Sequence, residues 1–366
     1  MTEKEYLYLL MNTKGLGAVG LHKLYDRFES FRESWMAGEK TLTASGILKE
    51  AQVKAILETK RIETELRREF EELEKRKIRF ITFQDADYPK RLKPFRDCPA
   101  GLFVRGRLPE DTVPSVAIVG ARGCSEYGKD TARGLAKELA EHGVQIISGL
   151  AVGVDGAAHT GALEAGEGGG GTFGILGCGI NICYPKENFR LFSEMAEKGG
   201  LMTEFIPGTK PIPGNFIMRN RIISGISDAV IVVEAKEKSG SLLTADYALE
   251  QGKEVFAVPG RITDGLSVGC NRLLQMGASL CLGPREILDI FGIKYEEKPI
   301  VGKIYEKRLA KNEKLVYSCL DSRPRHLEEI VLKCELPVRE AMEILLKLEL
   351  AGVIHGNGNQ YYYRKL

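Results

Sequence analysis

Short apolar runs alternate with longer amphipathic stretches between about residues 78 and 292. IRFITF is followed by SVAIVG, QIISG, FGILG, LMTEF, AVIVVEA, EVFAVPG and ASLCLG. These runs are mostly continuous rather than alternating in polarity, which is typical of strands covered on both faces. Helical patterns between the strands indicate right-handed crossover connections. The pattern therefore predicts an α/β fold over residues 77–292, a Rossmann-like, doubly wound and mostly parallel sheet.

The segment before this core has a helical pattern. Apolar positions recur at helical spacing in residues 1–76. Two glycine-containing turns, GLGAVG (15–20) and TASGI (43–47), are each followed by a further helical stretch. GLGAVG resembles a helix-hairpin-helix turn, whose backbone amides contact nucleic-acid phosphates, and TASGI is a looser copy. We predict a helical, helix-hairpin-helix-like (SAM-like) domain over residues 1–76.

Three short helical patterns and a hairpin on GNG end the chain. Residues 293–312 are predicted to be a linker, and residues 313–366 a winged helix-turn-helix domain. Pro337 fits the first turn of the third helix, and Gly352 fits its C-terminal cap. Three acidic and two basic residues lie on that helix: Glu340, Glu343, Glu349, Arg339 and Lys347. This balance disfavours the major groove of DNA, so docking to a protein, or a plain solvated face, is at least as good an interpretation.

Composition narrows the class of protein. The net charge of the 366 residues is only +2, so any anion site must be local. The eight cysteines form no C-x-x-C pair and the five histidines no cluster, which predicts neither a metal nor a cofactor. The N-terminus lacks a signal-peptide core, and no apolar run has the length of a membrane span. We expect a cytoplasmic protein that does not contact a membrane.

The loop after the first predicted parallel strand, GARGCSEYG, has the layout of an anion site. Gly120 lets the backbone turn, and the next helix presents free N–H groups and the positive end of its dipole. Arg122 can add a charge-assisted contact to a phosphate. The alternative is a structural turn that carries a surface arginine.

A second strand-turn-helix segment, SGLAVGVDGAAH (148–159), is expected at the same edge of the sheet. Asp155 is interpreted as a helix N-cap in preference to a catalytic group. His159 lies four residues later on the same helix face and is interpreted as a packed or supporting residue.

A third segment covers residues 218–253. Arg219 and Arg221 flank Asn220 at a predicted helix start, and Glu234 ends a buried strand. A strand-end carboxylate that faces two arginines has two readings. It is either a structural ion pair or a group that orients an arginine toward a ligand.

Two further segments have weaker signals. EGGGGT (167–172) precedes a strand instead of following one, which favours a flexible helix-to-strand connection over a phosphate loop. Tyr184, in CGINICYPKEN, lies at the ligand-binding edge. It is either a base-stacking residue or part of the core.

The motifs together resemble a known family. VGARGCSEYG, SGLAVGVDGAAHTGAL, LGCGINICYPKEN, RNRIISGISDAVIVVEA, SGSLLTA, AVPG and GCNRLLQMGA stand in the order and spacing of the DNA-processing protein A (DprA/Smf) family. The resemblance covers about residues 78–292. It implies binding of single-stranded DNA without sequence preference, loading of a RecA-type recombinase in natural transformation, homodimer formation and no enzymatic activity.

The resemblance also implies which residues contact DNA: Gly120, Arg122, Ser125, Gly149, Gly153, Gly179, Arg219, Asn220, Ser239 and Ser241. Supporting roles are expected for Asp155, His159, Arg221 and Glu234. Two positions depart from the family pattern. Ala121 replaces the usual serine, and Val152 stands where many members have lysine or arginine, which removes a phosphate partner and puts the DNA affinity in question.

Two enzyme classes are alternatives. One is a nucleotide-binding hydrolase of the lysine-decarboxylase-like Rossmann group, which cleaves nucleoside monophosphates. EKSGSLLTADYALE weakly resembles that group's motif but lacks its proline and two of its glycines. A nicotinamide dehydrogenase requires G-x-G-x-x-G, and the glycines here do not follow it.

Overall fold

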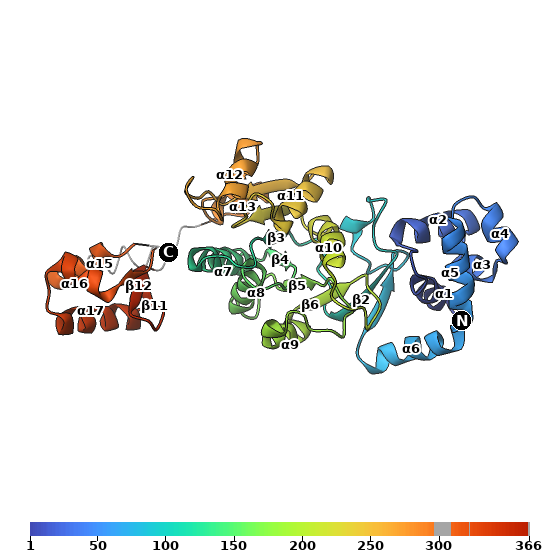
Figure 1. Ribbon diagram of the computed structural model, residues 1–366, viewed down its shortest axis with the longest axis horizontal. Helices are drawn as coiled ribbons and strands as arrows, with labels where there is room; N and C mark the ends of the chain where they lie inside the picture. The colour runs from blue at the N-terminus through green and yellow to red at the C-terminus, as the bar shows by residue number, and fades with distance from the viewer. Residues whose placement is uncertain (296–308, 322, 365–366) are drawn as a thin grey trace.

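The computed structural model describes residues 1–295, 309–321 and 323–364. Helices from the N-terminal part lie at one end of a central sheet, and a small C-terminal unit lies at the other (Figure 1). Most of the predicted linker, residues 296–308, is outside the described residues. Within the described ranges, no helix is both long and apolar enough to cross a membrane.

The central sheet has nine strands in the order β1-β2-β6-β5-β4-β3-β7-β8-β9. Strands β3 to β9 are parallel, while β2, near one edge, runs antiparallel to both of its neighbours, β1 and β6. The strands are β1 (Arg79–Thr82), β2 (Gly101–Gly106), β3 (Ser115–Val119), β4 (Gln145–Ser148), β5 (Thr172–Ile175), β6 (Gly200–Thr203), β7 (Ala229–Val232), β8 (Glu254–Ala257) and β9 (Ser279–Leu280). The predicted doubly wound, mostly parallel fold is confirmed. Strand β2 was not predicted, because its run GLFVRG directly follows a proline-rich basic stretch.

Alternate residues of each central strand enter two different cores. Val116 and Ile118 of β3 pack under α7 (Glu126–Glu141) and α8 (Val154–Glu164). Ala117 and Val119 pack under α10 (Pro213–Ile226), α11 (Gly240–Glu250) and α12 (Val268–Gln275). Every residue of β3 is buried, as the continuous apolar run predicted. Two helices, α9 (Phe189–Lys198) and α13 (Arg285–Ile290), complete the layers.

The N-terminal helices share a hydrophobic core with the sheet. They are α1 (Glu3–Met11), α2 (Ala18–Phe28), α3 (Phe31–Met36), α4 (Glu39–Ala44), α5 (Glu50–Lys60) and α6 (Glu63–Lys75). The ring of Tyr8 packs edge-on against Phe80 of β1 and Phe103 of β2. Gly15 and Gly46 turn the chain with φ of +78° and +69° between α1 and α2 and between α4 and α5. The predicted helices and turns are present, and they pack directly on the core.

The C-terminal unit is a winged helix, as predicted. It contains α15 (Lys311–Cys319), β10 (Arg325–His326), α16 (Leu327–Cys334), α17 (Val338–Leu350), β11 (Ile354–Gly356) and β12 (Tyr361–Arg364). Pro337 precedes α17 by one residue, one position earlier than predicted, and Gly352, with φ of +72°, follows its C-cap. The exposed face of α17 carries an apolar row, Val338, Met342, Leu346 and Leu350. This row, like the acidic residues, makes α17 a poor reader of DNA phosphates.

Candidate functional site

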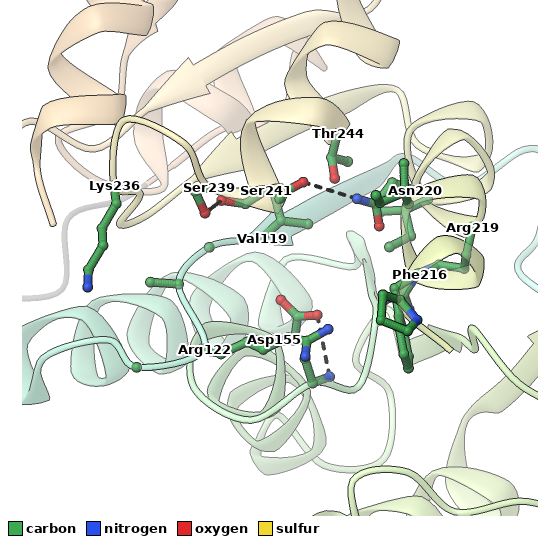
Figure 2. A pocket seen from close by; sticks show the side chains of 18 of the residues that line it. Val119, Arg122, Asp155, Phe216, Arg219, Asn220, Lys236, Ser239, Ser241 and Thr244 are labelled. Carbon is green, nitrogen blue, oxygen red and sulfur yellow. Dashed lines mark hydrogen bonds between the residues drawn. The ribbon is translucent and has the colours of Figure 1, made fainter. Parts of the chain in front are cut away.

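A cleft of about 570 Å³ opens at the carboxyl ends of β3 and β7. Strand β3 pairs with β4 on one side and with β7 on the other, so the cleft lies at the topological switch point of the sheet. Figure 2 shows its walls: the loop after β3, the start of α8, and the facing helices α10 and α11. Six predicted DNA-binding residues line it, namely Gly120, Arg122, Arg219, Asn220, Ser239 and Ser241.

Arg122 is an exposed cation of this cleft. Its guanidinium carbon lies 5.2 Å from the ring centroid of Phe216, which comes from α10. The backbone of Gly153 packs closely against the Arg122 loop: a Cβ at this position would lie 2.4 Å and 2.5 Å from the carbonyl oxygens of Ala121 and Arg122. The predicted importance of Gly153 therefore has a packing cause, the close approach of two backbone segments.

Ser125 and Glu234 form a contact that the sequence did not indicate. The Ser125 hydroxyl donates to Glu234 Oε1 at 2.6 Å, and the Ser125 amide donates to Oε2 at 2.8 Å. Ser125 also caps α7 by accepting from the amide of Gly128 at 3.0 Å. A carboxylate at a helix N-terminus is stabilised by the helix dipole. The expectation that Glu234 faces two arginines is thus wrong, and Ser125 has a structural role here.

Arg219 is buried, with 3% of its surface exposed. Its Nη1 donates to the carbonyl oxygens of Gly149, at 2.7 Å, and Ile175, so the guanidinium joins the ends of β4 and β5. Burial lowers the pKa of Arg219 to about 10, which keeps it charged at neutral pH. A Cβ on Gly149 would lie 2.4 Å from Nη1. Gly149 therefore makes room for this arginine beside the cleft.

Asp155 lies in the first turn of α8, whose N-cap is Gly153, so the predicted N-cap role is wrong. Its carboxylate accepts instead from the preceding amide of Ala151, at 3.4 Å. Burial raises the pKa of Asp155, while the charge of Arg219 opposes that change.

His159 is a packed residue, as interpreted from the sequence. Its side chain is fully buried, with Nδ1 2.7 Å from the hydroxyl of Thr172. Burial lowers its pKa to about 3, so the ring is neutral at physiological pH. It supports α8 against β5 and has no contact with the cleft surface.

The two residues that follow Arg219, Asn220 and Arg221, point in different directions. Asn220 Nδ2 donates to the carbonyl of Gly240 at 3.1 Å, which ties α10 to the start of α11 (Figure 2). Arg221 pairs with Glu204 at 2.5 Å and with Asp97 at 3.5 Å, away from Glu234. Arg221 therefore forms a buried structural ion pair, and Asn220 shapes the cleft wall.

The structure does not bring Gly179 to the cleft. Its amide donates to Thr209 at 3.0 Å, and a Cβ there would lie 2.6 Å from the amide nitrogen of Gly208. Gly179 lines none of the described hollows, so its predicted DNA contact has no structural support.

Two aromatic residues, Tyr184 and Phe216, lie side by side at the site. Tyr184 is 39% exposed, and its ring centroid lies 5.4 Å from that of Phe216. Both rings line a side cavity of about 250 Å³ together with Arg122 and Val152. Exposure thus favours the stacking interpretation of Tyr184.

Two lysines, Lys236 and Lys238, follow β7 and line the main cleft. Sequence reasoning missed them, although their position directly after a buried strand was a usable signal. Phe216 gave no such signal, because its exposure depends on how α10 packs.

A doubly wound sheet with a cationic, aromatic-lined cleft at its switch point defines a Rossmann-like α/β protein. The family model described as DNA recombination-mediator protein A matches residues 79–292, and that of the DprA winged helix domain matches residues 306–357. The chain belongs to this DprA/Smf family.

Individual relatives agree with this assignment. The chain is 42% identical over 215 residues to DNA processing protein DprA of Streptococcus pneumoniae, covering 58% of this chain and 75% of the relative. It is 39% identical over 273 residues to protein Smf of Escherichia coli, covering 73% and 72%.

Two solved structures are also similar. The X-ray structure of S. pneumoniae DprA matches with a TM-score of 0.69 and 34% identity, over 81% of this chain and 99% of that one. Helicobacter pylori DprA, whose structure is described for its single-stranded DNA binding mode, matches with a TM-score of 0.53 and 32% identity, over 60% and 98%.

Proposed function

We propose that this protein binds single-stranded DNA without sequence preference in the cleft and acts as a recombination mediator. The observation that carries the proposal is the position of Arg122, exposed at the switch point and stacked over Phe216. A cation beside an aromatic face offers one partner for a phosphate and another for a base. The DNA-binding mode described for the H. pylori relative supports the same ligand class.

The residues that line the cleft support the proposed lack of sequence preference. Arg122, Lys236 and Lys238 supply positive charge for the DNA backbone, which is the same for every nucleotide. Phe216 and Tyr184 present π-faces, which stack on any base. Asn220, the amide group best suited to reading a base edge, is held by Gly240.

The direct test is fluorescence anisotropy of a labelled oligo-dT over a salt series, beside a duplex of equal length. We expect binding that weakens with salt and exceeds binding to the duplex. Phe216→Ala should weaken binding by roughly 1–3 kcal/mol, the value of one stacked base, because α10 then offers no ring. Phe216→Tyr is the matched control and should keep most of the affinity. Equal affinity of the alanine variant would remove Phe216 from the site.

Two finer roles are part of the proposal. The edge beside β9 exposes Met276, Leu280 and Leu282, at 67%, 44% and 72%. An open strand edge with apolar side chains suits pairing with a second copy of the chain, so we place the homodimer contact there. Sedimentation of the Met276→Glu variant checks this contact, since a variant that remains dimeric contradicts this surface.

Loading of a RecA-type recombinase is the second role. It is checked by the rate of filament formation on a DNA strand covered by single-strand binding protein.

The alternative, a nucleotide hydrolase, has no observation in its favour. Asp155 is the sole carboxylate among the described residues that line the main cleft, and it is buried. Acid-base cleavage of a glycosidic bond generally uses a pair of carboxyl groups. Release of free adenine on incubation of the protein with AMP would support this alternative.

A further inference from the structure

A groove of about 470 Å³ lies next to the cleft on the same two helices. Helix α11 lines the cleft with Thr244 and the groove with Tyr247, and α10 lines them with Asn220 and Met218. At 1.5 Å of rise per residue, Thr244 and Tyr247 are separated by about 4.5 Å along the axis of α11. The two hollows are therefore neighbours, and a ligand chain that leaves one can enter the other.

The opposite wall of the groove is formed by two helix hairpins of the N-terminal part, at the turn between α1 and α2 and at the turn between α4 and α5. Gly17 and Lys23 line it from α2 and the turn before it, and Lys49 lines it from the start of α5. Gln52 Nε2 donates to the carbonyl of Gly15 at 2.8 Å, which fixes the two hairpins to each other. The ring of His22 lies 2.9 Å from the carbonyl oxygen of Cys98, which fixes α2 to the core. This wall is thus held in place relative to α10 and α11.

The charge of the groove is available to an external anion. Lys23 and Lys49 are exposed, and neither has an ion-pair partner among the residues that the structure describes. Elsewhere on the same surface Lys54 pairs with Glu50 at 2.6 Å. The buried Arg221 uses its charge on Glu204 and on Asp97, the acidic residue of the groove. What remains is a positive wall.

The groove also offers apolar surface for bases. Met218 is 49% exposed, and Tyr247 is half-buried beside it. Val19, 45% exposed, lies on the hairpin side. A groove with lysines on one wall and an aromatic residue on the other has the two elements of a single-strand site, an electrostatic track and a stacking surface.

We propose that the strand bound in the cleft continues over α10 and α11 into this groove, where Lys23 and Lys49 contact its phosphates and Tyr247 contacts a base. The proposal rests on the proposed function, and it assigns the N-terminal helices a share of the binding site. It predicts a footprint longer than the cleft alone would give.

Two oligo-dT lengths test the proposal, about six nucleotides, to fill the cleft alone, and about 20, to reach the groove. The double variant Lys23→Glu/Lys49→Glu should bind the short strand as the unchanged protein does and the long strand at least about tenfold more weakly. Loss of two phosphate contacts should also make the salt slope for the long strand shallower by about 1.4. Lys40→Glu/Arg68→Glu changes the charge equally on exposed N-terminal residues outside the groove and should leave both affinities close to the original.

Equal loss for both double variants, or no loss for either, would overturn the proposal while leaving the cleft site intact. Failure of the unchanged protein to bind even the short strand would instead overturn the proposed function. A second measurement uses the unchanged protein and a strand with 5-iodouracil, followed by mass spectrometry. A photocrosslink to Tyr247 with the long strand supports the path, and crosslinks confined to the cleft residues contradict it.

Discussion

Replacing Arg122 with glutamate is expected to weaken binding of single-stranded DNA by about 100-fold or more. A hydrogen bond to a charged group contributes about 1.5–3 kcal/mol, and each 1.4 kcal/mol changes affinity tenfold. The substitution removes that contact and places a negative charge in the same cleft, so repulsion of the phosphate adds to the loss. Arg122 is exposed, and among the described residues it forms no ion pair with a carboxylate. The fold should therefore be unaffected.

The measurement is anisotropy of labelled oligo-dT at several salt concentrations. The slope of log K against log salt should become shallower by about 0.7 for the lost contact. Arg68→Glu carries the same charge change on an exposed residue of α6 and should retain the affinity. If Arg122→Glu binds as tightly as that control, the DNA lies elsewhere, and the hairpin turns or the winged helix become the primary site.

The parts of the fold that the sequence predicted are those determined by local pattern. Seven parallel strands follow from continuous apolar runs, and the winged helix follows from three amphipathic stretches and a glycine hairpin. The shared core of the N-terminal helices and the sheet did not follow, because aromatic contacts such as Tyr8 with Phe103 join distant segments. Whether residues 76 and 292 are true domain boundaries stays a prediction.

The same distinction holds for the site. Arg122 was predictable because strand, glycine turn and helix fall within one short stretch. The partner of Glu234 was not, since Ser125 lies 109 positions away in the chain. Arg221 likewise pairs with Glu204 and Asp97, on segments that no pattern joins to it. Charge alone marks a residue as important without indicating which buried partner determines its orientation.

Gly153→Ala is expected to destabilise the core by about 3 kcal/mol or more. Gly153 has φ of +82° and ψ of −129°, a conformation that costs an L-residue on the order of 1–3 kcal/mol. The added Cβ would also lie 2.4 Å from Ala121 O and 2.5 Å from Arg122 O. Because these are backbone atoms, the whole Arg122 loop has to move, and DNA affinity should fall by roughly tenfold even where the protein is folded.

Gly166→Ala separates the two causes. Gly166 also has positive φ, +75°, yet a Cβ there meets no atom within 4 Å. This control should therefore lose only about 1 kcal/mol of stability, the conformational cost, and keep full DNA affinity. Urea unfolding followed by circular dichroism gives the stability, and anisotropy at low temperature gives the affinity. Equal losses in the two variants would show that backbone conformation alone requires glycine at position 153. The Arg122 loop would then not depend on the absence of a Cβ there.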